Sequence, residues 1–221
     1  IILASGLLSM SACTDPTDAI DSDQLRSKAN AGEKKFDEPF SGTNGRACGD
    51  CHVDGDHRAL TPDHVDDLLD EDPDNPLFQD IDADVRGTDD PTFNNLSHGL
   101  ARVILPLPDN MDVIDFAGNV ITPPDRMIEV WRAVPSVDNT SFTGPYLHDG
   151  RADTLEEQAL GAIEGHSENT HAIGQGALKR IADFERTQFS SDRARFVHEQ
   201  IEAGVDPLDV PNPEDDPAYL A

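Results

Sequence analysis

Apolar residues recur at helical spacing in only a few segments of this chain, and long polar stretches separate them. The first such segment is 25–40, in which Ala29, Gly32 and Phe36 share one face of a helix. A cluster of Ser, Gly, Thr and Asn residues then ends the pattern. The next helical pattern is short and covers 63–70.

Three more helices are expected towards the C-terminus. Asp153 or Thr154 is suited to cap a helix over 155–163, because either side chain can accept a hydrogen bond from the free amides of the first turn. Amphipathic patterns then cover 176–187 and 191–203. Regular helix is therefore expected mainly at the two ends of the chain.

Between these groups of helices the chain is rich in Asp, Pro, Gly and Asn. Apart from the helix over 63–70, residues 61–92 and 93–150 are expected to be mostly irregular, with short extended runs at 101–105 and 111–116. The fold class expected is therefore mainly α, with long irregular loops rich in Pro, Gly and Asp.

The chain carries 44 acidic and 16 basic residues, which gives it a formal charge of −28. Binding to nucleic acid or to anionic lipid headgroups through surface charge is excluded, because both need a basic face. A surface of this kind favours encounters with basic partners. Adaptation to salty surroundings, or simple solubility, remains an equal alternative.

The first residues resemble an export signal. An apolar run leads through Ser11 and Ala12 into Cys13, and small residues before a Cys resemble a bacterial lipoprotein cleavage site. The resemblance implies a signal over 1–13 and acylation of Cys13, with an ordinary secretion signal as the alternative. The mature protein is then expected to be periplasmic or at the cell surface, anchored to a membrane as a lipoprotein.

The rest of the chain divides by composition. Residues 14–24 are polar and acidic and suit a flexible tether, whereas 205–221 form an acidic, Pro-rich tail. All the expected helices lie in 25–204, which is therefore expected to be the single folded domain.

The segment Cys48-Gly49-Asp50-Cys51-His52 has the C-x-x-C-H arrangement of c-type haem attachment. Two Cys at this spacing can reach the two vinyl groups of one porphyrin edge, and the next residue then places its imidazole over the iron. A thioredoxin-like redox pair would not need the His, and a zinc site would need two further ligands close by. We therefore expect 25–204 to be a cytochrome c-like helical domain around one covalent haem c.

The other axial position of the iron is open to several residues. His57 lies too close to His52 in sequence to wrap to the opposite side, and His64 and His198 are expected on exposed helices. Six candidates remain in the domain: His98, His148, His166, His171, Met111 and Met127.

Separated segments carry a resemblance to a known family. The run AVPSVDNTSFTGPYLHDGRADTLEE at 133–157 resembles the V-P-(S/T)-L-R-N-…-P-Y-x-H-D-G-…-T-L-E-E signature of the bacterial di-haem cytochrome c peroxidase superfamily. The run AGEKKF at 31–36, together with the C-x-x-C-H motif, is similar to the opening of one haem domain in that family. The run IADFERTQFSS at 181–191 is similar to the helix that closes it. The chain is identified as a member with a single haem motif.

Two features depart from the family pattern. Di-haem peroxidases have two C-x-x-C-H motifs and use the second haem as an electron donor, whereas this chain has one motif. Asp138 stands where the signature has Arg, which puts the contact made by that Arg in doubt.

The resemblance also implies a distal ligand. In the family, a Met after the T-L-E-E helix ligates the haem of the second domain, and His166 lies at about that place here. His166 is therefore the candidate distal ligand, with His171, Met127 or a vacant position as alternatives. His148 is expected to donate or accept a hydrogen bond near the haem. Trp131 and Tyr146 are expected to pack in the core or to contact a propionate.

Asp80, Asp82 and Asp84 alternate as in the start of a calcium-binding loop. The pattern then fails, because Val85 stands at the position that needs Gly and Pro91 at the position that needs Glu. A solvated acidic loop is expected instead.

Two functions fit these features. The first is an electron carrier that transfers single electrons to a redox partner protein, in one version as a subunit of a membrane-bound electron-transfer complex. The alternative is a peroxidase-like haem enzyme with an open sixth iron position, which would need an acid or base such as Glu164 or Glu168 above the iron.

Overall fold

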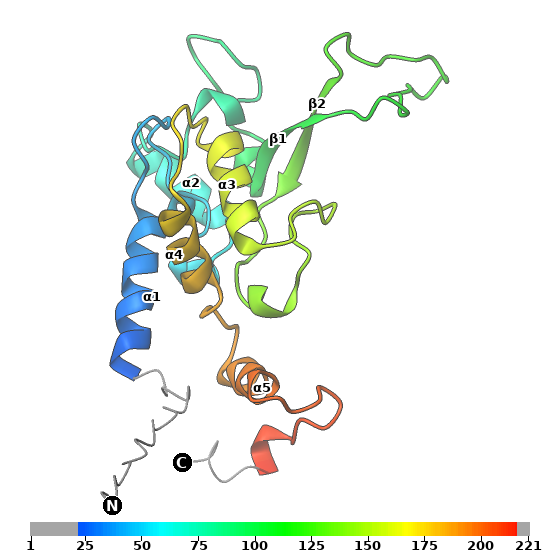
Figure 1. The fold of residues 1–221 in the computed structure, drawn as a ribbon. Coiled ribbons are helices and arrows are strands. Elements are labelled where there is room, and N and C mark those ends of the chain that lie inside the picture. The colour runs from blue at the N-terminus through cyan, green and yellow to red at the C-terminus, as the bar shows by residue number, and fades with distance from the viewer. Residues whose placement is uncertain (1–21, 216–221) are drawn as a thin grey trace, which may run out of the picture.

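The computed structural model describes residues 22–215. This part of the chain contains five α-helices and one two-stranded antiparallel sheet, joined by long loops and short 3-10 turns (Figure 1). The helices are α1 (Ser22–Asp37), α2 (Pro62–Glu71), α3 (Leu155–His166), α4 (Gln175–Glu185) and α5 (Asp192–Glu202), and the strands are β1 (Leu100–Pro106) and β2 (Met127–Ala133).

The expectation of a mainly α fold is wrong, because β1 and β2 make the described part a mixed α/β structure. Their register runs from Leu100 opposite Ala133 to Pro106 opposite Met127. The apolar run at 101–105 lies in β1, as expected, but 111–116 forms no strand. Strand β2 was expected to be irregular. It is rich in the β-branched and aromatic residues that favour strands, but charged residues interrupt its alternation.

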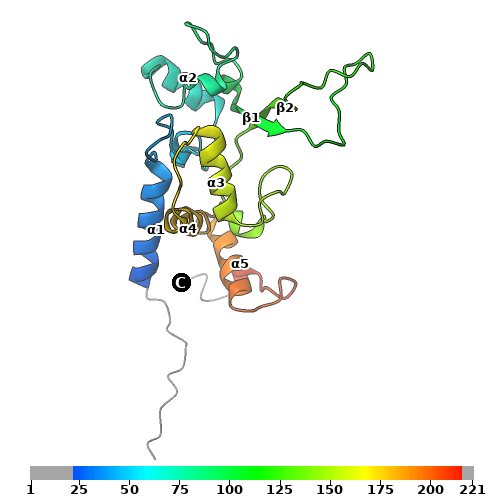
Figure 2. The same ribbon diagram turned by 45° about the horizontal axis from the view of Figure 1, so that its top comes forward.

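Helices α1, α3 and α4 form the compact half of the molecule, and Figure 2 shows α4 running between the other two. Helices α1 and α4 approach closely at Gly32. A Cβ atom built there would lie 2.3 Å from the Arg180 carbonyl oxygen and 2.6 Å from Phe184 Cβ. Only a glycine therefore allows this crossing.

The described residues form two apolar cores. The helical cluster comes mainly from α1, α3 and α4 and contains Phe36, Val137, Ala159, Ile163, Leu178, Ile181 and Phe184. The loop cluster comes from α2 and the loops around it and contains Leu60, Val65, Leu77, Ala83, Phe93 and Leu96. Burial of these side chains supplies most of the driving force for folding.

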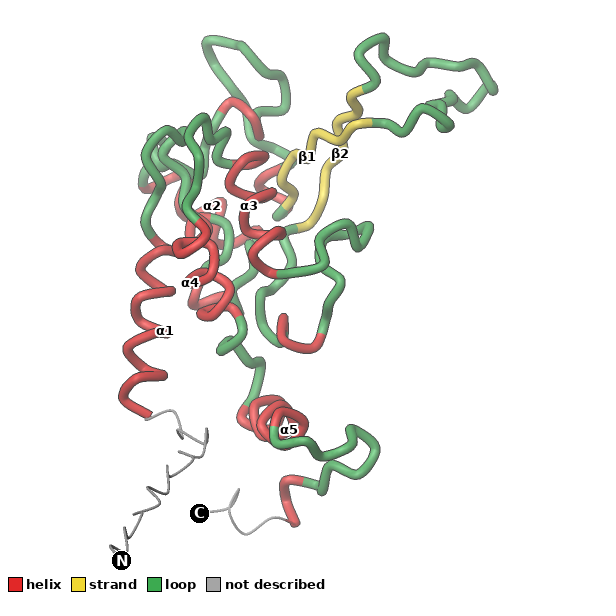
Figure 3. Tube along the Cα trace, viewed as in Figure 1, coloured by secondary structure: helices red, strands yellow, loops and turns green. Residues whose placement is uncertain are grey.

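Residues 107–126, which join β1 to β2, extend away from the rest of the molecule as a long arm (Figures 1 and 3). Helix α5 lies at the other end of the molecule, beyond α4. Near the end of the described chain, Pro213 is buried at the start of a 3-10 turn, within the predicted tail 205–221.

The predicted signal over 1–13, its Cys13 and most of the tether over 14–24 lie outside the described residues. Within 22–215, none of the helices has the length and apolar character needed to cross a bilayer.

Candidate functional site

The C-x-x-C-H segment forms a tight turn between the two clusters. The amides of Cys51 and His52 both donate to the Cys48 carbonyl oxygen, at 3.1 and 2.9 Å. Asp50 closes the turn by accepting a hydrogen bond from the Ala47 amide at 2.7 Å. Cys48 packs against the helical cluster and Cys51 against the loop cluster. The two thiols thus stand at the junction of two apolar walls.

Neither thiol is in an environment that favours the reactive thiolate. Burial raises the pKa of Cys51 to about 11. Burial also raises the pKa of Cys48 far above its usual range, and the nearby Glu185 carboxylate adds to this rise. Redox-active and catalytic cysteines need a lowered pKa, so these surroundings argue against a thioredoxin-like pair.

His52 is oriented by the loop that follows it. Its Nδ1 lies 3.0 Å from the Arg58 carbonyl oxygen, and a neutral ring that donates there leaves Nε2 free to bind a metal. The Phe36 ring packs on one side, with the two ring centroids 5.9 Å apart. Burial lowers the pKa of His52, so the neutral, ligating form is favoured.

Arg58 fixes the position of this loop. Its guanidinium stacks on Phe184, 4.7 Å from the ring centroid, and forms an ion pair with Asp54 at 2.8 Å. It also donates to Gln188 Oε1 at 3.0 Å, which ties the loop to the segment after α4. The carbonyl that accepts from His52 is therefore held by contacts on several sides.

His166 is the last residue of α3. Thr154 and Glu157 cap the start of this helix, since each side chain accepts hydrogen bonds from backbone amides of the first turn or the cap. Of the two caps expected, Thr154 is the observed one. Among the described residues, none makes a hydrogen bond with the His166 ring.

The imidazoles of His52 and His166 lie near each other, although the two residues are 114 positions apart in the sequence. Burial lowers the pKa of both rings, and the proximity of His166 lowers that of His52 further. Two hydrogen bonds fix the main chain at His166: its carbonyl oxygen accepts from the Arg46 side chain at 3.3 Å and from the Asn44 side chain at 3.2 Å.

A buried ion pair supports this end of α3. Arg46 and Asp82 approach to 2.7 Å, and both side chains are almost fully buried. Asp82 also accepts from the Arg102 amide at 2.5 Å. The expectation of a solvated acidic loop is therefore wrong for Asp82, which lies inside the protein because Arg46 neutralises it there.

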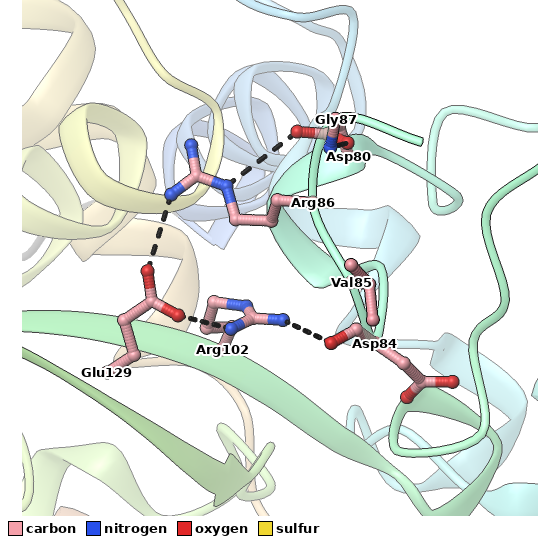
Figure 4. Close-up of a pocket in the computed structure, with 7 residues that line it drawn as sticks. All are labelled: Asp80, Asp84, Val85, Arg86, Gly87, Arg102 and Glu129. Carbon is pink, nitrogen blue, oxygen red and sulfur yellow. Dashed lines mark hydrogen bonds and ion pairs between the residues drawn. The ribbon is translucent and has the colours of Figure 1, made fainter. Parts of the chain in front are cut away.

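Asp80 and Asp84 of the acidic loop line a polar hollow beside the sheet, to which β1 contributes Arg102 and β2 contributes Glu129 (Figure 4). Arg86 lies 3.7 Å from Asp80 and 3.5 Å from Glu129, and Arg102 pairs with Glu129 as well. Asp84 caps the next turn by accepting hydrogen bonds from Thr92, Asn94 and Asn95. These charges neutralise one another and join the loop to the sheet.

The other candidate axial ligands occupy outlying places. Met127 is partly exposed, where β2 joins the arm, and Met111 is exposed on the arm itself. His171 is exposed and packs against Gly42. His98 is exposed, and its ring contacts the Asn94 carbonyl oxygen at 2.6 Å.

The other residues predicted to lie near the haem or in the core, His148, Trp131 and Tyr146, each make a specific contact. His148 is exposed, and its Nε2 lies 3.1 Å from the Arg132 guanidinium. Trp131 stacks under the Arg102 guanidinium at 4.4 Å. Tyr146 donates to the Thr140 carbonyl oxygen at 3.2 Å.

Sequence reasoning missed two residues near the motif. His64, expected on an exposed helix face, is half-buried and lines the same hollow as His52. Glu185 is buried at the end of α4, and its Oε2 has no hydrogen-bond partner in the described chain. Burial raises the pKa of Glu185 to about 8. Its position on the apolar face of the helix, four residues after Ile181 and seven after Leu178, was the signal of burial in the sequence.

These residues fit a covalently bound c-type haem. Two partly buried thiols at the required spacing adjoin an apolar wall each, and His52 offers Nε2 to the iron. A second, partly buried imidazole, whose ring makes no hydrogen bond in the described chain, lies near it. Buried apolar walls and imidazole ligands are what such a group needs.

A family model described as "Di-haem cytochrome c peroxidase" matches residues 26–204. Among curated proteins and among solved structures, no match to the chain is found.

Proposed function

Because the chain belongs to the di-haem cytochrome c peroxidase family, we propose that it is a c-type cytochrome that transfers single electrons. Membership makes it a haem-binding, cytochrome c peroxidase-like protein. The finer proposal is one haem c, attached to Cys48 and Cys51, with His52 and His166 as the two axial ligands.

The observation that carries the proposal is the pair of partly buried imidazoles beside two partly buried thiols. When bound, haem c supplies an iron centre that takes up and releases one electron. His52 would bind with Nε2, because Nδ1 is engaged by the Arg58 carbonyl oxygen. His166 would occupy the second axial position and exclude small molecules from it. The apolar walls would keep water away and so favour the less charged redox state.

The family name favours the alternative, a peroxidase-like enzyme with an open sixth position. Such an enzyme needs an acid or base near the bound peroxide. Glu164 and Glu168 are both exposed, and Glu168 accepts a hydrogen bond from Asn44 at 3.0 Å. Neither of these two expected acids is thus buried beside the imidazoles, so neither supports the enzyme.

We also propose export and acylation of Cys13, on the apolar run that precedes it. Such an anchor would hold the domain at a membrane surface outside the cytoplasm and near membrane-bound redox partners.

The first test is production in a host that exports the chain and attaches c-type haem. We expect covalent haem on a denaturing gel for the wild type and for Cys13→Ser. The pair Cys48→Ser/Cys51→Ser should have none. Haem retained by the double variant would refute the attachment site.

The second test separates the carrier from the peroxidase on the same haem-loaded protein. A carrier should exchange electrons rapidly with a small redox mediator while carbon monoxide and peroxide leave its spectrum unchanged. Rapid reaction with peroxide, with turnover of a reducing substrate, would instead establish the enzyme.

A further inference from the structure

The arm at 107–126 displays an unusual concentration of exposed apolar side chains. Five of them are more than half exposed, and one of these, Phe116, is fully exposed: Met111, Ile114, Phe116, Val120 and Ile121. Single exposed apolar residues are ordinary, but such a group on one projecting element indicates a contact surface. Figure 1 shows the arm standing clear of the rest of the molecule.

Hydrogen bonds within the arm give it a defined structure, in which these side chains are exposed. The Arg126 guanidinium donates to the Met111 carbonyl oxygen at 2.6 Å, and the Ile121 amide donates to the Val113 carbonyl oxygen at 2.8 Å. Nearer the tip, the Asn119 amide donates to Asp115 at 2.8 Å. A preformed surface loses less conformational entropy on binding than a disordered one does.

The charges of the arm define its partner. Asp109 is fully exposed and Asp112 more than half exposed, whereas Arg126, the arm's only basic residue, is less exposed and lies within 3.9 Å of both. The apolar side chains therefore stand among carboxylates, on a chain of formal charge −28. A basic surface with an apolar centre complements both features.

A second copy of the chain is disfavoured, because the same carboxylates and the same net charge would meet. An anionic bilayer is disfavoured for the same reason.

We propose that the arm is a docking site for a basic protein whose exposed apolar patch is surrounded by Lys and Arg side chains. The apolar tip would bury against that patch, while Asp109 and Asp112 would pair with its rim. Because a single arm makes the contact, the complex is expected to be weak, transient and sensitive to salt. The proposal does not rest on the redox role, because binding is assayed in a fixed iron state.

The test is calorimetric titration of the haem-loaded full chain, kept oxidised, with a lysine-rich c-type cytochrome as the basic probe. The variant is Ile114→Ser/Phe116→Ser/Val120→Ser. The matched control is Leu208→Ser, which removes an equally exposed apolar side chain far from the arm. We expect the triple variant to bind at least ~10-fold more weakly and the control to bind like the wild type. Asp109→Lys should weaken binding and reduce its salt dependence.

Equal binding by the wild type and the triple variant, or no binding by the wild type, would overturn the proposal. Sedimentation and vesicle flotation are run on the same samples. Self-association that the triple variant loses would assign the arm to a second copy instead. Vesicle binding that it loses would assign the arm to a membrane. Circular dichroism verifies that all variants are folded.

Discussion

At the scale of single residues, the burial of Glu185 gives the protein a specific pH dependence. The ordinary pKa of this carboxyl is 4.5, and burial raises it to about 8. The folded state therefore keeps a proton that the unfolded state releases between these values. The resulting contribution to stability is fully present below about pH 4.5 and is lost as the pH rises to about 8.

Glu185→Gln should remove this dependence, because an amide keeps the shape of the protonated acid without ionising. We expect the free energies of unfolding of variant and wild type to be similar near pH 5. Near pH 8.5 the variant should be more stable, by on the order of a few kcal/mol. Thermal melts of the haem-loaded proteins measure this difference. Parallel melting curves at both pH values would show that Glu185 ionises normally.

The Arg46–Asp82 pair gives a second prediction at this scale. Asp82→Ala leaves the Arg46 guanidinium buried without its carboxylate, which should cost about 3–5 kcal/mol of stability. The control is Asp89→Ala, which changes an exposed acid and should stay within about 0.5 kcal/mol of the wild type. Denaturant titration measures both. Equal midpoints for the two variants would contradict the buried pair.

At the scale of elements, the crossing of α1 and α4 depends on Gly32. Gly32→Ala would overpack this contact and should destabilise the fold by about 1–3 kcal/mol, although alanine is the better helix former. Gly161→Ala in α3 is the matched control, because a Cβ there meets no atom within 4 Å. It should stabilise by up to about 1 kcal/mol. Opposite shifts of the unfolding midpoint are thus expected, and shifts of the same sign would refute the close crossing.

Local pattern was sufficient for the helices. The expected helices over 63–70 and 155–163 are confirmed as α2 and α3, with ends that differ by at most three residues. Capping signals and apolar periodicity act within a few residues of each other, so the sequence displays them directly. The motif at 48–52 was also visible, because its spacing is local.

Features set by distant contacts were not visible in the same way. Asp82 is buried because Arg46 pairs with it from 36 positions away, and no local pattern shows that. Strand β2 forms because β1 supplies its hydrogen-bond partners, whereas its own sequence shows only weak alternation of apolar and polar residues.

At the scale of the whole molecule, the C-x-x-C-H turn connects two halves. The helical cluster and the loop cluster both reach it, so its two thiols belong to different cores. Of the two imidazoles, one follows the turn directly and the other comes from the far end of α3. Both halves must therefore fold together to assemble the proposed ligand pair.

The most direct test of this account is the spin state of the iron in the oxidised, haem-loaded protein, measured by absorption and EPR spectroscopy for the wild type and His166→Ala. The account predicts a low-spin wild type that ignores carbon monoxide when reduced, and a high-spin variant that binds it. The controls His171→Ala and His64→Ala should both stay low-spin. A high-spin wild type, or a His166→Ala variant that remains low-spin, would contradict the proposed His52–His166 ligand pair.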